Sequence, residues 1–133
     1  MSSGRWHHKG VTIAYLAEHP ALAILETLVH LEVGDLDEIP DTYTLSRVDV
    51  LPLASIQELV HAKLTDDWTN KPALTQALGV RWLRGSDSVL LKVPSAVAPE
   101  SFNYLYNPAH PDAASCSVGE SRRQPWDRRL FKI

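Results

Sequence analysis

The sequence is poor in the features that mark secreted and membrane proteins. It has one cysteine in 133 residues, which excludes an internal disulfide and is consistent with a reducing compartment. No apolar stretch is long enough to span a membrane, because Glu26 interrupts the best candidate. The first residues form neither a signal peptide nor an amphipathic transit sequence. These absences predict a soluble, cytoplasmic protein.

Conventional catalytic and cofactor motifs are also missing. The chain has no Walker loop, no GxGxxG dinucleotide fingerprint and no GxSxG nucleophile elbow. Its six histidines fit no HxxxH or HExxH pattern, so we expect no metal site. Cys116 lies in a polar late segment, which disfavours a thiol nucleophile. Four arginines between residues 122 and 129 are weak support for nucleic-acid binding when the net charge is −3, and none is expected.

The composition and the apolar pattern indicate one α+β domain. Hydrophobic content of 44% and charged content of 22% are ordinary globular values. Helices are expected at 20–32, 55–63 and 72–83, the first opening at His19-Pro20 and the second from a capping-box spacing. Strands are expected at 11–16, 42–50 and 88–93, with further strands or turns at 102–108, 115–118 and 128–133. Leu45 and Val48 lie on different phases of residues 42–50, which predicts a bulge there.

Glu26 is the most informative residue that is present. It is the only formally charged side chain in the apolar run from Pro20 to Leu31. A helix that is apolar nearly all round is predicted to be buried, and a buried carboxylate needs a partner or a task. No group at helical spacing in the run can neutralise it. Glu26 is therefore either a structural carboxylate that accepts hydrogen bonds from the backbone or an arginine, or a functional one.

Five phrases follow one another in order along nearly the whole chain: GRWHHKG at 4–10, LETLVHL at 25–31, LKVPS at 91–95, NYLYNPAHP at 103–111 and WDRRL at 126–130. Together they resemble the RES domain family, which is named for its Arg, Glu and Ser. The resemblance implies an ADP-ribosyltransferase-like mixed β-sheet core flanked by two or three helices. It implies a toxin that destroys cellular NAD+, by hydrolysis or phosphorolysis, or that transfers ADP-ribose to a protein.

The resemblance also implies roles for five residues. Arg5 would hold the dinucleotide, Tyr15 would stack on the nicotinamide ring, and Glu26 would engage the nicotinamide ribose. Ser95 would line the same pocket, and Asn107 would contribute to it. Glu26 has the structural alternative given above, and the other four residues have one each. Arg5 could be a flexible near-terminal residue and Tyr15 a core aromatic, while Ser95 could end a strand and Asn107 could belong to the turn before Pro108.

The residue types suit this chemistry independently of the family. The nicotinamide–ribose bond breaks through an oxocarbenium-like transition state, which a preorganised carboxylate stabilises. Nicotinamide leaves as a neutral pyridine, so one critical glutamate suffices without a general acid. An arginine offers a planar fork to pyrophosphate oxygens, and a tyrosine offers a flat face to a cationic ring.

The implied partner is an Xre-type helix-turn-helix antitoxin that covers the cleft, with a homodimer possible in the complex. Family members usually carry a further strand, with a Trp-Arg pair, ahead of the Gly-Arg-Trp motif. Only four residues precede Arg5 here, so we expect a single domain over residues 1–133 without that strand. A module that binds its antitoxin but no longer cleaves NAD+ is therefore a third hypothesis.

Overall fold

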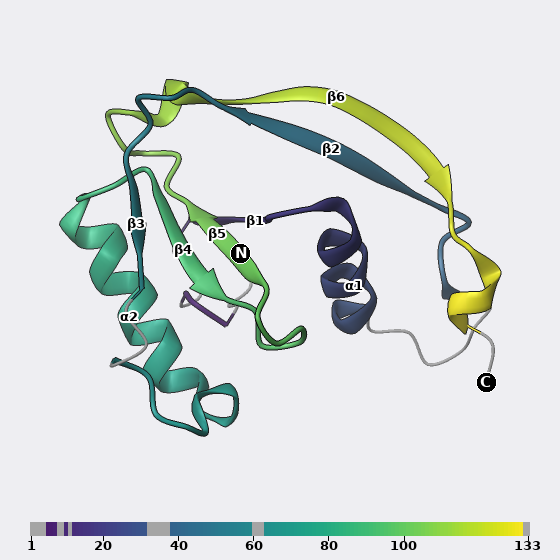
Figure 1. Ribbon diagram of the computed structural model, residues 1–133, viewed down its shortest axis with the longest axis horizontal. Coiled ribbons are helices and arrows are strands. Elements are labelled where there is room, and N and C mark those ends of the chain that lie inside the picture. The colour runs from purple at the N-terminus through teal and green to yellow at the C-terminus, as the bar shows by residue number, and fades with distance from the viewer. Residues whose placement is uncertain (1–4, 8–9, 11, 32–37, 60–62, 132–133) are drawn as a thin grey trace.

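The structure, a computed structural model, describes residues 5–7, 10, 12–31, 38–59 and 63–131. Its elements are β1 (Ala14–Ala17), α1 (Pro20–His30), β2 (Thr42–Val50), β3 (Ile56–Glu58), η3 (Trp68–Asn70), α2 (Pro72–Gly85), β4 (Leu90–Pro94), β5 (Phe102–Tyr106), η4 (Ala113–Ser115), β6 (Cys116–Pro125) and η5 (Arg128–Phe131), as Figure 1 shows. None of the helices in these ranges is long and apolar enough to cross a membrane.

A four-stranded mixed sheet forms the centre of the molecule. Its strand order is β1-β5-β4-β3, with β5 antiparallel to both neighbours and β3 parallel to β4. Helices α2 and α1 lie on opposite sides of this sheet (Figure 1). The mixed sheet with flanking helices confirms the predicted α+β class.

The hydrophobic core includes residues from the sheet, from α2 and from the segment before β1. Leu91 and Val93 share one face of β4 because successive side chains of a strand alternate between faces. They pack in one buried cluster with Trp6, Trp82 and Leu105. The sheet and α2 thereby hold Trp6 in a fixed place.

Gly79 allows the N-terminal segment to approach α2 closely. A Cβ atom built on Gly79 would lie 1.8 Å from the carbonyl oxygen of Trp6. One turn earlier, the Thr75 hydroxyl donates a hydrogen bond to the Arg5 carbonyl (2.5 Å). Glycine normally weakens a helix interior, so its presence in α2 is explained by this contact.

Strands β2 and β6 form a separate antiparallel ribbon that arches over α1 (Figure 1). The bounds of β2 match the predicted strand, and the register shift between Ser46 and Val48 confirms the predicted bulge. Strand β6 is longer than the predicted 115–118. A small aromatic cluster packs at one end of the ribbon. The centre of the Trp126 ring lies 4.5 Å from the ring centre of Tyr43 and 5.8 Å from that of Phe131.

The predicted helix at 55–63 is wrong where the structure describes it. Ile56–Glu58 is instead strand β3, paired with β4, and residues 60–62 lie outside the described ranges. Ser55 forms no capping box, because its hydroxyl donates to Asp112 and accepts from the backbone of Val89. Pairing with a strand distant in sequence has overridden the local helix signal.

Helix α1 begins at Pro20 as predicted, and the His19 ring caps it by accepting a hydrogen bond from Leu22 N (3.1 Å). It ends at His30; the predicted end at Glu32 lies outside the described residues, as does the predicted strand start at Val11. The expectation of a buried helix is wrong, because Leu22 is its one buried residue. Leu25 and Val29 are 37% and 55% exposed. Glu26 thus lies on a helix at the surface of the fold.

We predict that Gly79→Ala lowers the free energy of unfolding by about 1–3 kcal/mol, since the added methyl group would overlap the Trp6 carbonyl. Urea denaturation measures the loss, with Gly85→Ala at the end of α2 as the control, because a Cβ there meets nothing closer than 3.4 Å. Equal stabilities for both variants would contradict the close packing of Trp6 on α2.

Candidate active site

One cleft brings most of the predicted site residues together. Its volume is about 810 Å³, within the range of ligand sites. The N-terminal segment, β1, α1, β5 and the end of β4 enclose it. Its lining comprises Arg5, Trp6, His7, Thr12, Ile13, Tyr15, Leu16, Ala17, Ala23, Glu26, Thr27, Val29, His30, Leu31, Pro94, Ala96, Val97 and Asn103. Arg5, Tyr15 and Glu26, predicted from three separate segments, share this cleft.

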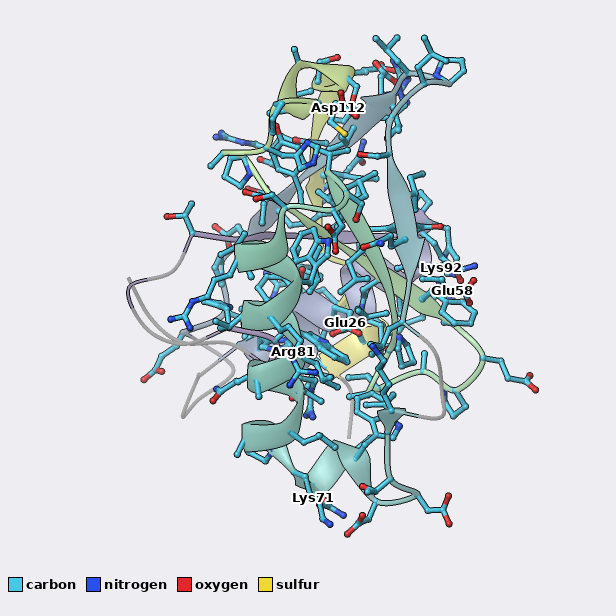
Figure 2. All side chains as sticks on the ribbon, turned by 90° about the vertical axis from the view of Figure 1, so that its left-hand side faces the viewer. Glu26, Glu58, Lys71, Arg81, Lys92 and Asp112 are labelled. Atoms are coloured by element: carbon cyan, nitrogen blue, oxygen red, sulfur yellow. The ribbon has the colours of Figure 1, made fainter. Side chains whose placement is uncertain are left out.

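Glu26 projects from the middle of α1 and is held by two neutral donors. Its Oε1 accepts a hydrogen bond from the Ser95 hydroxyl (2.7 Å) and another from the Asn103 side-chain amide (2.9 Å). Figure 2 shows Glu26 near the centre of the molecule, behind α2. Within the described residues, Glu26 forms no ion pair and its Oε2 accepts no hydrogen bond. Among the residues that the structure describes, the carboxylate is therefore ordered by neutral donors and has no counter-ion.

Ser95 donates a hydrogen bond to this carboxylate from a buried position outside the cleft lining. It is buried just after β4, and its Oγ accepts hydrogen bonds from the backbone N–H groups of Val97 (3.1 Å) and Ala98 (3.0 Å). Two accepted bonds direct its own proton to Glu26. Ser95 thus caps the turn after the strand, as the structural alternative predicts, and it also contacts the cleft residue Glu26. It does not itself line the cleft.

Tyr15 presents a ring that is 42% exposed at the cleft wall. Its hydroxyl accepts a hydrogen bond from Trp6 N (3.2 Å) and forms another with His7 Nδ1. Burial of the hydroxyl raises the pKa of Tyr15 above its usual value of 10.0, so the phenol stays neutral at physiological pH. The hydroxyl end is anchored while the ring face remains available to a ligand.

Arg5 lines the cleft. Its guanidinium donates to the carbonyl of Thr69 (3.0 Å) and lies 5.8 Å from the ring centre of Trp68. That bond uses one of five N–H donors, which leaves others for an anionic ligand.

Asn107 lies apart from the cleft lining. It is buried, and its Oδ1 accepts a hydrogen bond from the backbone of Ala109 (3.0 Å), which is the turn arrangement expected before Pro108. The structure thus gives Asn107 a structural contact and no place among the lining residues. Its predicted part in ligand binding stays a prediction.

Two polar cleft residues that contact Glu26, Asn103 and His30, are absent from the site predicted from the sequence. Asn103 opens the NYLYNPAHP phrase, but no periodicity shows that it meets Glu26. His30 follows Glu26 by one helical turn, and its Nδ1 lies 2.7 Å from the Glu26 carbonyl oxygen. The i, i+4 spacing could have placed His30 beside Glu26. In the described parts of the chain, no group of three or more His, Cys, Asp or Glu side chains could hold a metal ion.

The fold and the site define an α+β domain with one ordered carboxylate in a ligand-sized cleft. The RES domain model matches residues 1–127, and this chain belongs to the RES domain family. A protein named Toxin Res from Pseudomonas putida is 42% identical over 129 residues, covering 97% of this chain and 86% of that protein. The family membership inferred from the five phrases is thereby confirmed.

Two further relatives cover most of the chain. The Prs ADP-ribosylating toxin of a Sphingobium species is 35% identical over 142 residues, which is 99% of this chain and 83% of that protein. A Toxin Res of Yersinia enterocolitica is 34% identical over 119 residues, 85% of this chain and 73% of its own.

We predict that Ser95→Ala lowers the free energy of unfolding by about 1–3 kcal/mol, because two backbone N–H groups and Glu26 each lose a partner. Chemical denaturation measures the change. Ser117→Ala, at an exposed position of β6, is the control and should change stability by less than about 0.5 kcal/mol. A Ser95 variant as stable as this control would contradict the role of Ser95 as a clamp.

Proposed function

We propose that this protein is the toxin of a toxin–antitoxin pair and that it depletes cellular NAD+ by cleaving the nicotinamide–ribose bond. The observation that carries the proposal is the Glu26 carboxylate, which Ser95 and Asn103 order in the cleft and which has no counter-ion in the described part of the chain. Three relatives whose names contain the word toxin support the first part, and one named as ADP-ribosylating supports the use of NAD+.

The reaction needs a negative charge beside the ribose. As the bond to nicotinamide breaks, positive charge develops on the ribose, and a fixed carboxylate stabilises it most strongly where water is excluded. An ion-paired glutamate would have its charge already neutralised. Glu26 has only neutral partners among the described residues, so its full charge is available to the transition state.

The rest of the cleft fits the remainder of the dinucleotide. We place the nicotinamide ring against the anchored face of Tyr15, where a cationic ring meets the π-electrons of the phenol. Arg5, held by Thr69, is placed to bind the pyrophosphate through its remaining N–H donors. Ser95 acts in this scheme by holding Glu26.

A second candidate function is transfer of ADP-ribose to a protein, and the name of the Sphingobium relative favours it. The same carboxylate serves this reaction, because only the acceptor differs. Label from adenine-labelled NAD+ that becomes attached to a macromolecule would establish transfer. Label recovered in free ADP-ribose or its 1″-phosphate would establish hydrolysis or phosphorolysis.

We predict that Glu26→Gln abolishes nicotinamide release from NAD+ while the protein stays folded, since glutamine keeps the shape and loses the charge. Mass spectrometry of the reaction with purified protein measures release, with and without phosphate. Glu120→Gln, an exposed substitution on β6, is the control and should keep the wild-type rate. Release that persists in Glu26→Gln would refute the role of the carboxylate, and a lost cooperative melt would make Glu26 structural.

We also propose an Xre-type antitoxin as the cytoplasmic partner, seated over the cleft. We predict that saturating antitoxin stops nicotinamide release by the purified toxin, because it would cover the opening that NAD+ must enter. The measurement is the rate of release against antitoxin concentration. An unchanged rate in a complex shown to be fully formed would overturn this steric mechanism.

A further inference from the structure

Glu26 Oε1 receives its second hydrogen bond from Asn103, which is one of the best-fixed residues of the sheet. Asn103 lies in β5, between Ala17 of β1 and Val93 of β4 in the register of the strands. Strand β5 has a paired neighbour on each side, so Asn103 lies on an interior strand of the sheet. Its side-chain amide then spans from the sheet to α1, joining positions 77 residues apart in sequence (2.9 Å).

The two donors to Glu26 differ in what else they do. Ser95 also accepts two backbone hydrogen bonds, so its hydroxyl belongs to the turn after β4 as well as to the carboxylate. The Asn103 amide nitrogen donates to Glu26 and to no other described residue. The carboxylate oxygen is the acceptor in this contact, and the amide nitrogen of Asn103 is the donor. Asn103 also lines the cleft itself.

A carboxylate on a helix at the surface can turn about its side-chain bonds. Both donors contact Oε1 and restrain the carboxylate, while Oε2 accepts no hydrogen bond from the described residues. Helix α1 contributes little to this restraint, because most of its side chains are exposed or half-buried. The orientation of the reactive oxygen therefore depends on the sheet, through Asn103.

We propose that Asn103 is a positioning residue that orients Glu26 so that Oε2 faces the substrate. This inference rests on the proposed cleavage of NAD+ and adds a residue to it. Asn103 acts through Glu26, so its loss should reduce the rate of bond cleavage and leave the affinity for the dinucleotide nearly unchanged.

The kinetic experiment compares Asn103→Ala and Asn103→Asp with wild type in the nicotinamide-release assay. We expect kcat to fall about 10- to 100-fold in Asn103→Ala, with KM changed less than about threefold, because a misplaced catalytic group costs up to about 100-fold in rate. Aspartate has nearly the same shape but presents a like charge in place of the donor, so Asn103→Asp should lose at least as much.

Asn70→Asp is the matched control. Asn70 is exposed, lies outside the cleft lining and forms no side-chain hydrogen bond with described residues, so the same substitution should leave kcat at the wild-type value. An Asn103→Asp variant with wild-type kcat would show that shape alone matters and would overturn the proposal. A rise in KM with kcat unchanged would also overturn it, since it would make Asn103 a binding residue.

A measurement without substrate separates this inference from the proposed function. The carboxyl-carbon NMR resonance of Glu26, assigned by its absence in Glu26→Gln, should shift in Asn103→Ala and stay in place in Asn70→Asp. Wild-type protein that releases no nicotinamide would reject NAD+ cleavage. The resonance would still decide on Asn103: a shift supports its hold on the carboxylate, and an unmoved resonance overturns it.

Discussion

The hydrogen bonds at one oxygen of Glu26 are the interaction on which the site depends. They connect α1 to the turn after β4 through Ser95 and to the middle of the sheet through Asn103. Neutral donors stabilise a carboxylate through their dipoles and leave its charge in place. An arginine would partly neutralise that charge. The arrangement keeps the Glu26 carboxylate ordered and without an ion-pair partner among the described residues, and an ordered, unpaired carboxylate is what the proposed stabilisation of a short-lived cation on a ribose needs.

The opposite wall of the cleft depends on a second contact, the close approach of the N-terminal segment to α2. Gly79 leaves room for the Trp6 carbonyl, and Thr75 binds the Arg5 carbonyl. Trp6 N in turn donates to the hydroxyl of Tyr15. The packing of the N-terminal segment on α2 thus helps to place Arg5 and Tyr15, the residues proposed to bind the pyrophosphate and the nicotinamide ring. Packing and ligand binding are coupled here through only a few residues.

The sequence predicts those parts of the structure that are determined locally. The phase change in β2 marks its bulge, His19-Pro20 marks the start of α1, and an isolated charge in an apolar run singles out Glu26. Pairing between distant segments is not visible in this way. Strand β3 is wrongly predicted as helix because its parallel partner lies about thirty residues away along the chain. The contact between Asn103 and Glu26 is missed for the same reason, and the exposure of α1 depends on tertiary packing.

The most direct test of the account is a crystal structure of the Glu26→Gln variant with NAD+, in which the uncleaved substrate can accumulate. We expect the nicotinamide ribose beside residue 26, the nicotinamide ring on Tyr15 and the pyrophosphate at Arg5. Dinucleotide bound with its ribose away from residue 26, or a cleft that remains without nucleotide at saturating NAD+, would contradict the assignment of this cleft as the site of NAD+ cleavage.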